Sequence, residues 1–455
     1  MTYRGLLVVI PTRNRFPLAR RAIESVLSQG ISGVMILVSD NSTDQQQRHD
    51  LAAYCAGLPA DLVRYVSPPS PLPMAAHFDW AMSNAAMESA SHVAYLQDRT
   101  VFKRGAITAL LDVVSAFPED VVSFNRDYLD DSRRPVRLLL SDWTGRIFRI
   151  KSSHLLQLSA RAYHPPQLPD VLNAAVPFDV VQEIRKVFGN VFDSISPDFC
   201  FAYRCLAIRD SVIYYDRPVY LAYAPDRSNG ISYARGQASS DSLDFAANLG
   251  ALRNFAAPVP ALHGITNAVV HEYCFVREEF TGSALPPVNM PAYLGEIDFE
   301  LRHLVDKKLI IDNRRMLREL GWSSRQRAQF FIRKCTEMLL ADPLWVLERL
   351  TLRQLTQANW STRFWRWFDR HPITWTPGGL RLFNSAEEGL AFGIEHLRTR
   401  ARHLGSMRRR RITRDAAVEI HVRPANRADA IKGTPTTTAP AEAGELSQFK
   451  GIDLP

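Results

Sequence analysis

The stretch LLVVIPTRNR, residues 6–15, begins a pattern of apolar runs that alternate with helical segments. Its apolar run, residues 6–10, is far shorter than the ~18 residues of a membrane span and predicts a buried strand. The residues that follow place apolar side chains at helical spacing on one face. The alternation continues with VMILVSD at 34–40, DLVRYVS at 61–67, the helical AAHFDWAMSNAAMES at 75–89 and SHVAYLQD at 91–98. Apolar strands that alternate with helices predict a mostly parallel sheet covered on both faces.

Polar residues follow three of these strands. In sheets of this kind, ligands bind beyond the carboxyl ends of the strands. The rule points to residues 12–15, 39–44 and 97–99 as parts of one binding site.

Two of these strand ends carry a family resemblance. IPTRNR at 10–15 and VSDNSTD at 38–44 resemble the N-terminal half of family 2 glycosyltransferases with the GT-A fold. The resemblance covers about residues 1–235 and implies a GT-A-like, Rossmann-type mixed sheet flanked by helices. It also implies that these strand ends hold the nucleotide of a sugar donor. The implied pocket residues are Pro11, Thr12, Arg13 and Asp40, with Asn41 and Asp44 shaping the loop.

The chemistry of these side chains suits a nucleotide. A carboxylate such as Asp40 can accept the N–H of a uracil-like base, and an arginine can lie near ribose or phosphate. Asp40, Asn41 and Asp44 are also residue types that form turns and cap the following helix. The order of motifs on both strands favours the nucleotide-binding interpretation.

The next strand ends in YLQDRT, residues 95–100. The family commonly has an Asp-x-Asp motif here, whose carboxylates hold a divalent metal against the donor diphosphate. This chain matches it with Asp98 and Thr100, and Arg99 stands between them after Gln97. A hard cation prefers several oxygen ligands, so Mn²⁺ or Mg²⁺ at Asp98 is only weakly supported.

Three interpretations of this altered motif stay open. Asp98 can bind a metal through waters and donor phosphates. Alternatively, cationic side chains such as Arg99, Lys103, Arg227 or Arg235 neutralise the diphosphate, and this alternative is slightly favoured. In the third interpretation Arg99 simply pairs with Asp98, which leaves the site weak or inactive.

SPDFCFAYR, residues 196–204, carries the second resemblance. The family usually opens a helix here with a Glu-Asp pair followed by an arginine. Pro197 replaces the glutamate, while Asp198 and Arg204 match the other two. The family's aspartate is the general base that takes the proton of the acceptor hydroxyl, so Asp198 is the predicted base. An aspartate after Ser-Pro is also a common helix start.

The rest of the chain divides into two predicted parts. Residues 236–415 are expected to form a mainly helical C-terminal domain, and residues 416–455 a disordered tail. Arg227 lies in the loop DRSNGISYARG, 226–236, and is a candidate phosphate contact. The aromatic and basic segment 359–375 predicts helical packing, with contact to a membrane surface as the alternative.

Composition limits the partners. The chain has 455 residues and a formal net charge of +8, which favours anionic partners. Its five cysteines show no zinc-type spacing and fit a reducing cytoplasm, with peripheral contact at the inner face of the membrane left open. No nucleic-acid-binding module is found, so no nucleic acid partner is expected.

The family resemblance, with Asp198 as the single predicted base, implies an inverting glycosyltransferase. It would move a sugar from a nucleoside-diphosphate donor, with UDP-sugar favoured, to a hydroxyl of a glycan, glycolipid or protein. The alternative is a catalytically silent subunit that binds sugar nucleotides or assists assembly.

Overall fold

The computed structural model describes residues 5–85, 90–132, 134–228, 230, 233, 255–280, 285–302, 304, 306–341, 380–398 and 416–421. The elements below lie in one compact unit, residues 1–420. The segments around Arg235 and at 359–375 lie outside the described residues.

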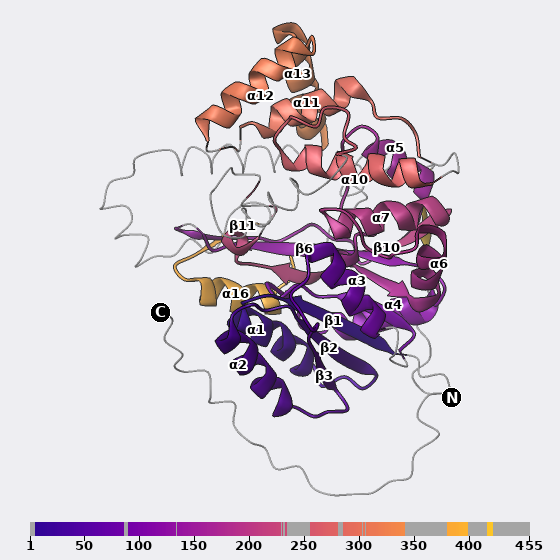
Figure 1. Cartoon of the computed structure of the whole chain (residues 1–455), viewed down its shortest axis with the longest axis vertical. Helices are drawn as coiled ribbons and strands as arrows, with labels where there is room; N and C mark the ends of the chain where they lie inside the picture. Colours follow the sequence, from indigo (N-terminus) through magenta and orange to yellow (C-terminus); the bar gives the residue numbers. More distant parts are fainter. Residues whose placement is uncertain are drawn as a thin grey trace, which may run out of the picture. The chain divides into compact units, whose positions relative to one another are not determined.

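A mixed sheet of 12 strands forms the centre of the described structure (Figure 1). Its main path runs β12-β8-β10-β6-β9-β4-β1-β2-β3, with β5, β7 and β11 added to it. The strands are β1 (Leu6–Thr12), β2 (Val34–Asp40), β3 (Val63–Val66), β4 (His92–Tyr95), β5 (Thr100–Phe102), β6 (Val122–Asp130), β7 (Val136–Leu139), β8 (Ile147–Lys151), β9 (Ala174–Pro177), β10 (Ser211–Ala222), β11 (Leu380–Phe383) and β12 (Ala417–Ile420).

The first half of the sheet is parallel and the second half is largely antiparallel. β1 pairs in parallel with β2 and β4, and β2 with β3. β9 runs antiparallel between β4 and β6, whereas β6 and β10 are parallel neighbours. The predicted α/β class with a mixed sheet flanked by helices and followed by further helices is confirmed.

Helices cover both faces of this sheet. The helices of the described residues are α1 (Phe16–Leu27), α2 (Gln45–Ala56), α3 (Met74–Ala85), α4 (Ala106–Ala116), α5 (Ser152–Ser159), α6 (Phe178–Phe188), α7 (Pro197–Ile208), α10 (Ile265–Glu279), α11 (Met290–Glu300), α12 (Lys307–Glu319), α13 (Ser324–Ala341) and α16 (Ala386–Glu395), with the short 3₁₀ turns η1 (Val171–Asn173) and η2 (Pro225–Arg227). Of these, α11 packs on α10, and α12 and α13 pack on α11, away from the strands (Figure 1).

The apolar run of β1 explains the two layers. Successive side chains of a strand point to opposite faces, so Leu6 and Val8 pack with α1, α2 and α4. Leu7 and Val9 pack on the other face with α3, α5, α6 and α7. Because both faces are buried, every residue of this strand is buried, as the continuous apolar pattern predicts.

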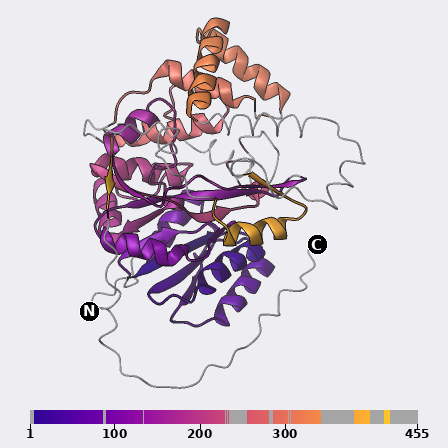
Figure 2. The same cartoon turned by 180° about the vertical axis from the view of Figure 1, so that it is seen from behind.

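Helices from the predicted C-terminal domain join the core of the sheet domain. α10 packs directly against α7, and the two lie side by side in both views (Figures 1 and 2). Val269, Tyr273 and Leu294 share one apolar cluster with Val9 of β1. The division at residue 235 itself stays a prediction.

Two late segments extend the sheet, which differs from the predicted division. β11 pairs antiparallel with β7, although it falls in the predicted helical domain. β12 pairs with β8, although it begins the predicted disordered tail. Both are short runs with alternating apolar residues, a pattern that composition alone does not reveal. Residues 422–455 lie outside the described residues.

A search of the described residues finds no helix with the length and apolarity that crossing a bilayer requires.

Candidate active site

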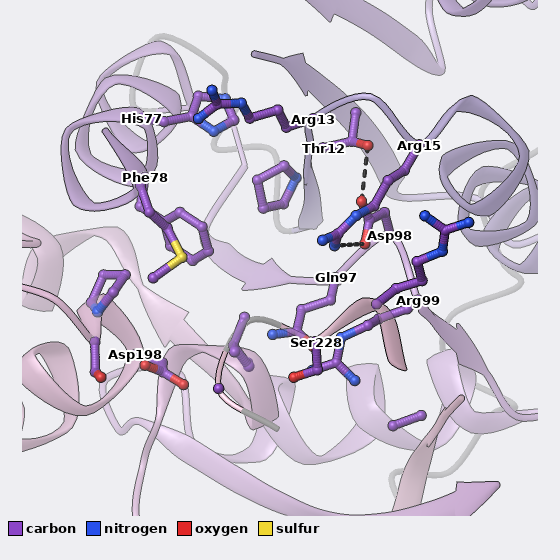
Figure 3. A pocket seen from close by; sticks show the side chains of 18 of the residues that line it. Thr12, Arg13, Arg15, His77, Phe78, Gln97, Asp98, Arg99, Asp198 and Ser228 are labelled. Carbon is purple, nitrogen blue, oxygen red and sulfur yellow. Dashed lines mark hydrogen bonds and ion pairs between the residues drawn. The ribbon is translucent and has the colours of Figure 1, made fainter. Parts of the chain in front are cut away.

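A cavity of about 840 Å³ lies where the carboxyl ends of β1, β2 and β4 meet the start of α7. Figure 3 shows Asp98, Arg15 and Arg99 on one side of it and Asp198 with Phe78 on the other. The lining residues from the predicted site are Pro11, Thr12, Arg13, Asn41, Gln97, Asp98, Arg99, Asp198 and Arg227. The structure thus brings together residues from distant parts of the chain.

The ends of β1 and β2 are fastened to each other by Asn14. Its side-chain Oδ1 accepts hydrogen bonds from the backbone N–H groups of Thr43 and Asp44, at 2.8 and 2.9 Å. Its own N–H donates to Ser42 Oγ at 2.8 Å. Asn14 adopts a left-handed φ of 56°, a conformation that asparagine tolerates better than most residues. This arrangement fixes the loop that carries Arg13, one of the residues that line the pocket.

Asp40 does not line the pocket. Its side chain is fully buried, and its two oxygens accept hydrogen bonds from Ser42 N–H and the Tyr65 hydroxyl, both at 2.9 Å. The prediction that Asp40 lines the pocket is therefore wrong, because its carboxylate is buried beneath the loop and stabilises it through these hydrogen bonds. Asp44 caps α2 by accepting from Gln46 N–H, which matches the alternative interpretation of this motif.

Asn41 lines the pocket, but its side-chain amide makes hydrogen bonds within the protein. Its Nδ2 donates to the carbonyl of Leu72, and its Oδ1 accepts from the Leu72 N–H, both at 2.8 Å. This pair holds the segment before α3 against the end of β2, as a loop-shaping residue would. α3 then supplies Met74, His77 and Phe78 to the pocket wall.

Asp98 is held by neighbours that are not metal ligands. Thr12 Oγ1 donates to its Oδ2 at 3.0 Å, and Arg15 Nη1 lies 3.5 Å from its Oδ1 (Figure 3). The carboxylate is nearly buried, with 6% of its side chain exposed. Asp98 therefore fastens the end of β1 to the loop after β4.

Arg99 stands within a group of arginines. Burial is the main cause that lowers its pKa to about 10; Asp98 acts to raise the pKa, and the positive charges of Arg126 and Arg15 act with burial to lower it. Its guanidinium is still charged at neutral pH. The backbone carbonyl of Arg99 accepts from Tyr223 N–H at 3.0 Å, which sets this loop beside the end of β10 and the turn carrying Arg227.

Lys103, named as a possible phosphate contact, is not in the pocket. Its ammonium is buried and donates to Asp127 and to the carbonyls of Gly393 and His396. It fastens the end of α16 to the sheet, so the prediction that Lys103 contacts phosphate is wrong.

The side chains around Asp98 offer few of the oxygen ligands that a divalent cation prefers. Thr12 and Arg15 already engage its two oxygens, and Thr100 is buried in β5. Across the described residues, no group of three or more His, Cys, Asp or Glu side chains could hold a metal ion. Mn²⁺ and Mg²⁺ prefer several oxygen ligands, and nearby guanidinium groups repel them.

Asp198 lies in the first turn of α7 and faces the pocket. Burial, and then the negative charge of Asp170, raise its pKa to about 7. The N–H of Phe199 and the charge of Arg126 oppose this rise. A carboxylate with a pKa near neutral pH is well suited to accept a proton from a hydroxyl and release it again.

Glu272 of α10 supports the helix start that carries Asp198. Its Oε1 accepts from the backbone N–H groups of Ile195 at 3.0 Å and Ser196 at 2.7 Å. Glu272 is fully buried, and burial raises its pKa to about 8. Arg204, the other family match, instead pairs with Asp193 and Glu279 inside the protein and does not line the pocket.

Several site residues were not identified from the sequence. Arg126 and Tyr128 line the pocket from β6, where the outward-facing positions alternate with buried ones. That alternation within FNRDYLD was the available signal. His77 also lines the pocket; burial and the charge of Arg13 lower its pKa to about 4, so it is neutral at pH 7. Glu272 left no local pattern, because its partners are far along the chain.

Comparison with known proteins gives the family of the N-terminal part. Residues 7–167 match the model of glycosyl transferase family 2. The predicted resemblance is therefore confirmed over this range, and the match supports the predicted enzyme class. This family 2 segment includes the loops that carry Arg13, Asp98 and Arg99, and it ends before Asp198.

The family 2 segment lies within a fold that is distantly similar to solved structures of S. aureus TarS. TarS residues 1–349 in complex with UDP-GlcNAc share 11% identity with this chain at a TM-score of 0.39, covering 67% of this chain and 82% of that one. A second TarS structure shares 12% identity at a TM-score of 0.37, covering 67% and 50%. Similarity at this level carries no substrate or mechanism to this chain. A search of curated protein sequences found no match.

Proposed function

We propose that the protein is an inverting glycosyltransferase that takes its sugar from a nucleoside-diphosphate donor, with UDP-sugar as the favoured donor. One observation carries the proposal: the arginines around Asp98 and the carboxylate of Asp198 line the same cavity. A volume of about 840 Å³ suits a ligand of the size of a sugar nucleotide. The family 2 match over residues 7–167 agrees with this assignment.

One side of the pocket suits the phosphates of the donor, and the other suits the reacting hydroxyl of the acceptor. The arginine side offers bidentate contacts to phosphate oxygens. Asp198 lies on the other side and would accept the proton of the acceptor hydroxyl. The acceptor oxygen would then attack the anomeric carbon in a single displacement, which inverts its configuration.

The acceptor would enter beside Asp198. Leu172, Phe199, Ile265 and Val269 line the pocket, so apolar surface borders the side on which the hydroxyl would lie. A glycan, a glycolipid or a protein hydroxyl all remain in the proposal. Contact with a membrane surface would bring a lipid-linked acceptor to this entrance.

The proposal is tested by measuring donor binding and transfer for a panel of sugar nucleotides with the wild type and with Asp198→Asn. The substitution keeps the side-chain size but removes the base, so donor binding is expected to persist while transfer falls by about 10² to 10⁴-fold. Transfer at the wild-type rate by the variant would refute the assignment of the base. Binding without turnover by the wild type would support the silent sugar-nucleotide-binding subunit instead.

A further inference from the structure

The pocket carries an excess of positive charge around Asp98. Its lining includes five arginines and two aspartates: Arg13, Arg15, Arg99, Arg126, Arg227, Asp98 and Asp198. The arginines come from the loop after β1, the loop after β4, strand β6 and the turn η2. A diphosphate ester carries about two negative charges at neutral pH, which such a cluster can balance.

The sheet pairing explains why these arginines meet. β5 and β10 pair antiparallel, with Ala222 opposite Thr100, so the loop containing Arg99 lies beside the chain that continues to Arg227. β10 also pairs in parallel with β6, with Tyr220 opposite Arg126. Three segments, up to 128 positions apart in the sequence (Arg99 to Arg227), therefore present guanidinium groups at the same edge.

The arginines repel one another in the absence of an anion. Arg99 is half-buried, and the charges of Arg126 and Arg15 act against its own. Arg126 is exposed to the pocket. Gathering like charges in a partly desolvated site is unfavourable, and a bound anion relieves that repulsion. The arginine cluster is therefore suited to bind a multiply charged anion.

We propose that this pocket binds and neutralises the donor diphosphate through arginine side chains, chiefly Arg99 and Arg126, without a divalent cation. The inference rests on the proposed function. Asp98, which in this interpretation is not a metal ligand, anchors Thr12 and Arg15 beside the phosphate site.

The sugar-transfer step can proceed with Asp198 and the arginine side chains alone. The acceptor oxygen forms a bond to the anomeric carbon while the bond from that carbon to the diphosphate oxygen breaks. The hydroxyl proton passes to Asp198, and the diphosphate leaves with the electron pair of the broken bond. Guanidinium groups already in place can stabilise the charge that develops on the leaving oxygen.

Titration calorimetry of the full chain with UDP, in EDTA and in excess Mn²⁺ or Mg²⁺, tests the inference. The dissociation constant is expected to differ by less than about threefold between the two conditions. Arg126→Gln and Arg99→Gln are each expected to weaken binding by about tenfold or more in both conditions, because a charged hydrogen bond to phosphate is lost. Arg20→Gln on α1, an exposed arginine outside the pocket lining, is the matched control and should bind like the wild type.

The outcomes separate this inference from the proposed function. Binding that occurs only with the cation would overturn the inference and leave the glycosyltransferase proposal standing. Equal binding by wild type and both pocket variants would also overturn it. No binding of UDP, ADP, GDP or CDP in either condition would refute the proposed function, and the inference with it. An unchanged thermal unfolding midpoint will show that the exposed Arg126→Gln variant is folded.

Discussion

At the scale of single residues, the protonation state of Asp198 controls the proposed chemistry. Its pKa is raised to about 7, first by burial and then by the charge of Asp170. The base must be ionised to accept a proton, so the active fraction rises as the pH passes upward through about 7. An ordinary aspartate, by contrast, would be fully ionised well below this range.

The first prediction is a pH profile of kcat/KM that rises with pH, with its midpoint near 7, and levels off above it. Asp170→Asn removes the neighbouring negative charge, so the pKa of Asp198 should fall and the rise should move to lower pH. Asparagine keeps the side-chain oxygen that accepts from Leu172 N–H at 2.7 Å, so the local turn should persist. Initial rates measured across the pH range will check this.

Asp112→Asn provides the control for that shift, because Asp112 is exposed on α4 and does not line the pocket. Its profile should coincide with that of the wild type. A profile that is flat across neutral pH in the wild type would contradict the assignment of Asp198 as the base.

At the scale of elements, α10 holds the start of α7 in place. Glu272 Oε1 accepts from two backbone N–H groups just before Pro197, which begins the helix that carries Asp198. The contact joins residues more than seventy positions apart, so a helix of the C-terminal half positions the proposed base.

The second prediction concerns Glu272→Ala and Glu272→Gln. Alanine leaves two buried N–H groups without their acceptor, which costs about 1–3 kcal/mol of stability per group. Because the start of α7 loses this support, Asp198 should shift, and kcat should fall by roughly ten- to hundredfold while the KM for the donor changes little. Glutamine keeps the acceptor oxygen and should restore most of the activity. Steady-state kinetics of both folded variants, with unfolding curves, will distinguish positioning from simple destabilisation.

If Glu272→Gln were as stable as the wild type but as inactive as Glu272→Ala, then accepting these two hydrogen bonds would not be the role of Glu272.

α16 is the second element that supports the site from a distance. Its glycines pack against the sheet so closely that a Cβ at Gly393 would lie 2.6 Å from Leu221 Cδ2 and 3.1 Å from Leu138 Cδ1. Leu221 belongs to β10, which ends just before the turn with Arg227. The approach of α16 thus sets the position of the strand end beside the arginine cluster.

The third prediction is that Gly393→Val lowers the free energy of unfolding by about 1–3 kcal/mol, because the added methyl groups overpack this contact. Gly57→Ala is the matched control: a Cβ there meets its nearest atom, the Tyr54 carbonyl oxygen, at an ordinary 3.5 Å. Denaturant unfolding should show little change for the control. Equal stability of Gly393→Val and wild type would contradict the close packing of α16.

At the scale of the whole molecule, the strand pattern of the N-terminal part was predictable from sequence. The apolar runs at β1, β2, β3 and β4 gave both the class of fold and the edge at which the site lies. The roles of Asp98 and Asp198 as pocket residues followed from family motifs.

Long-range contacts were not predictable from local patterns. Asp40 has the residue type and motif of a base-contacting group, yet Tyr65 occupies its carboxylate from a neighbouring strand. Lys103 has the charge for phosphate, yet it is buried against α16, almost three hundred residues later. β12 is only four residues long, and its pairing with β8 is visible only in three dimensions. In each case, a tertiary partner decides the role.

A crystal structure of the full chain in complex with a sugar nucleotide will show whether one bound donor spans both sides of the pocket. We expect the diphosphate oxygens to contact Arg99 and Arg126, and the anomeric carbon to face the carboxylate of Asp198. A nucleotide bound outside this cavity, or a sugar directed away from Asp198, would contradict this expectation.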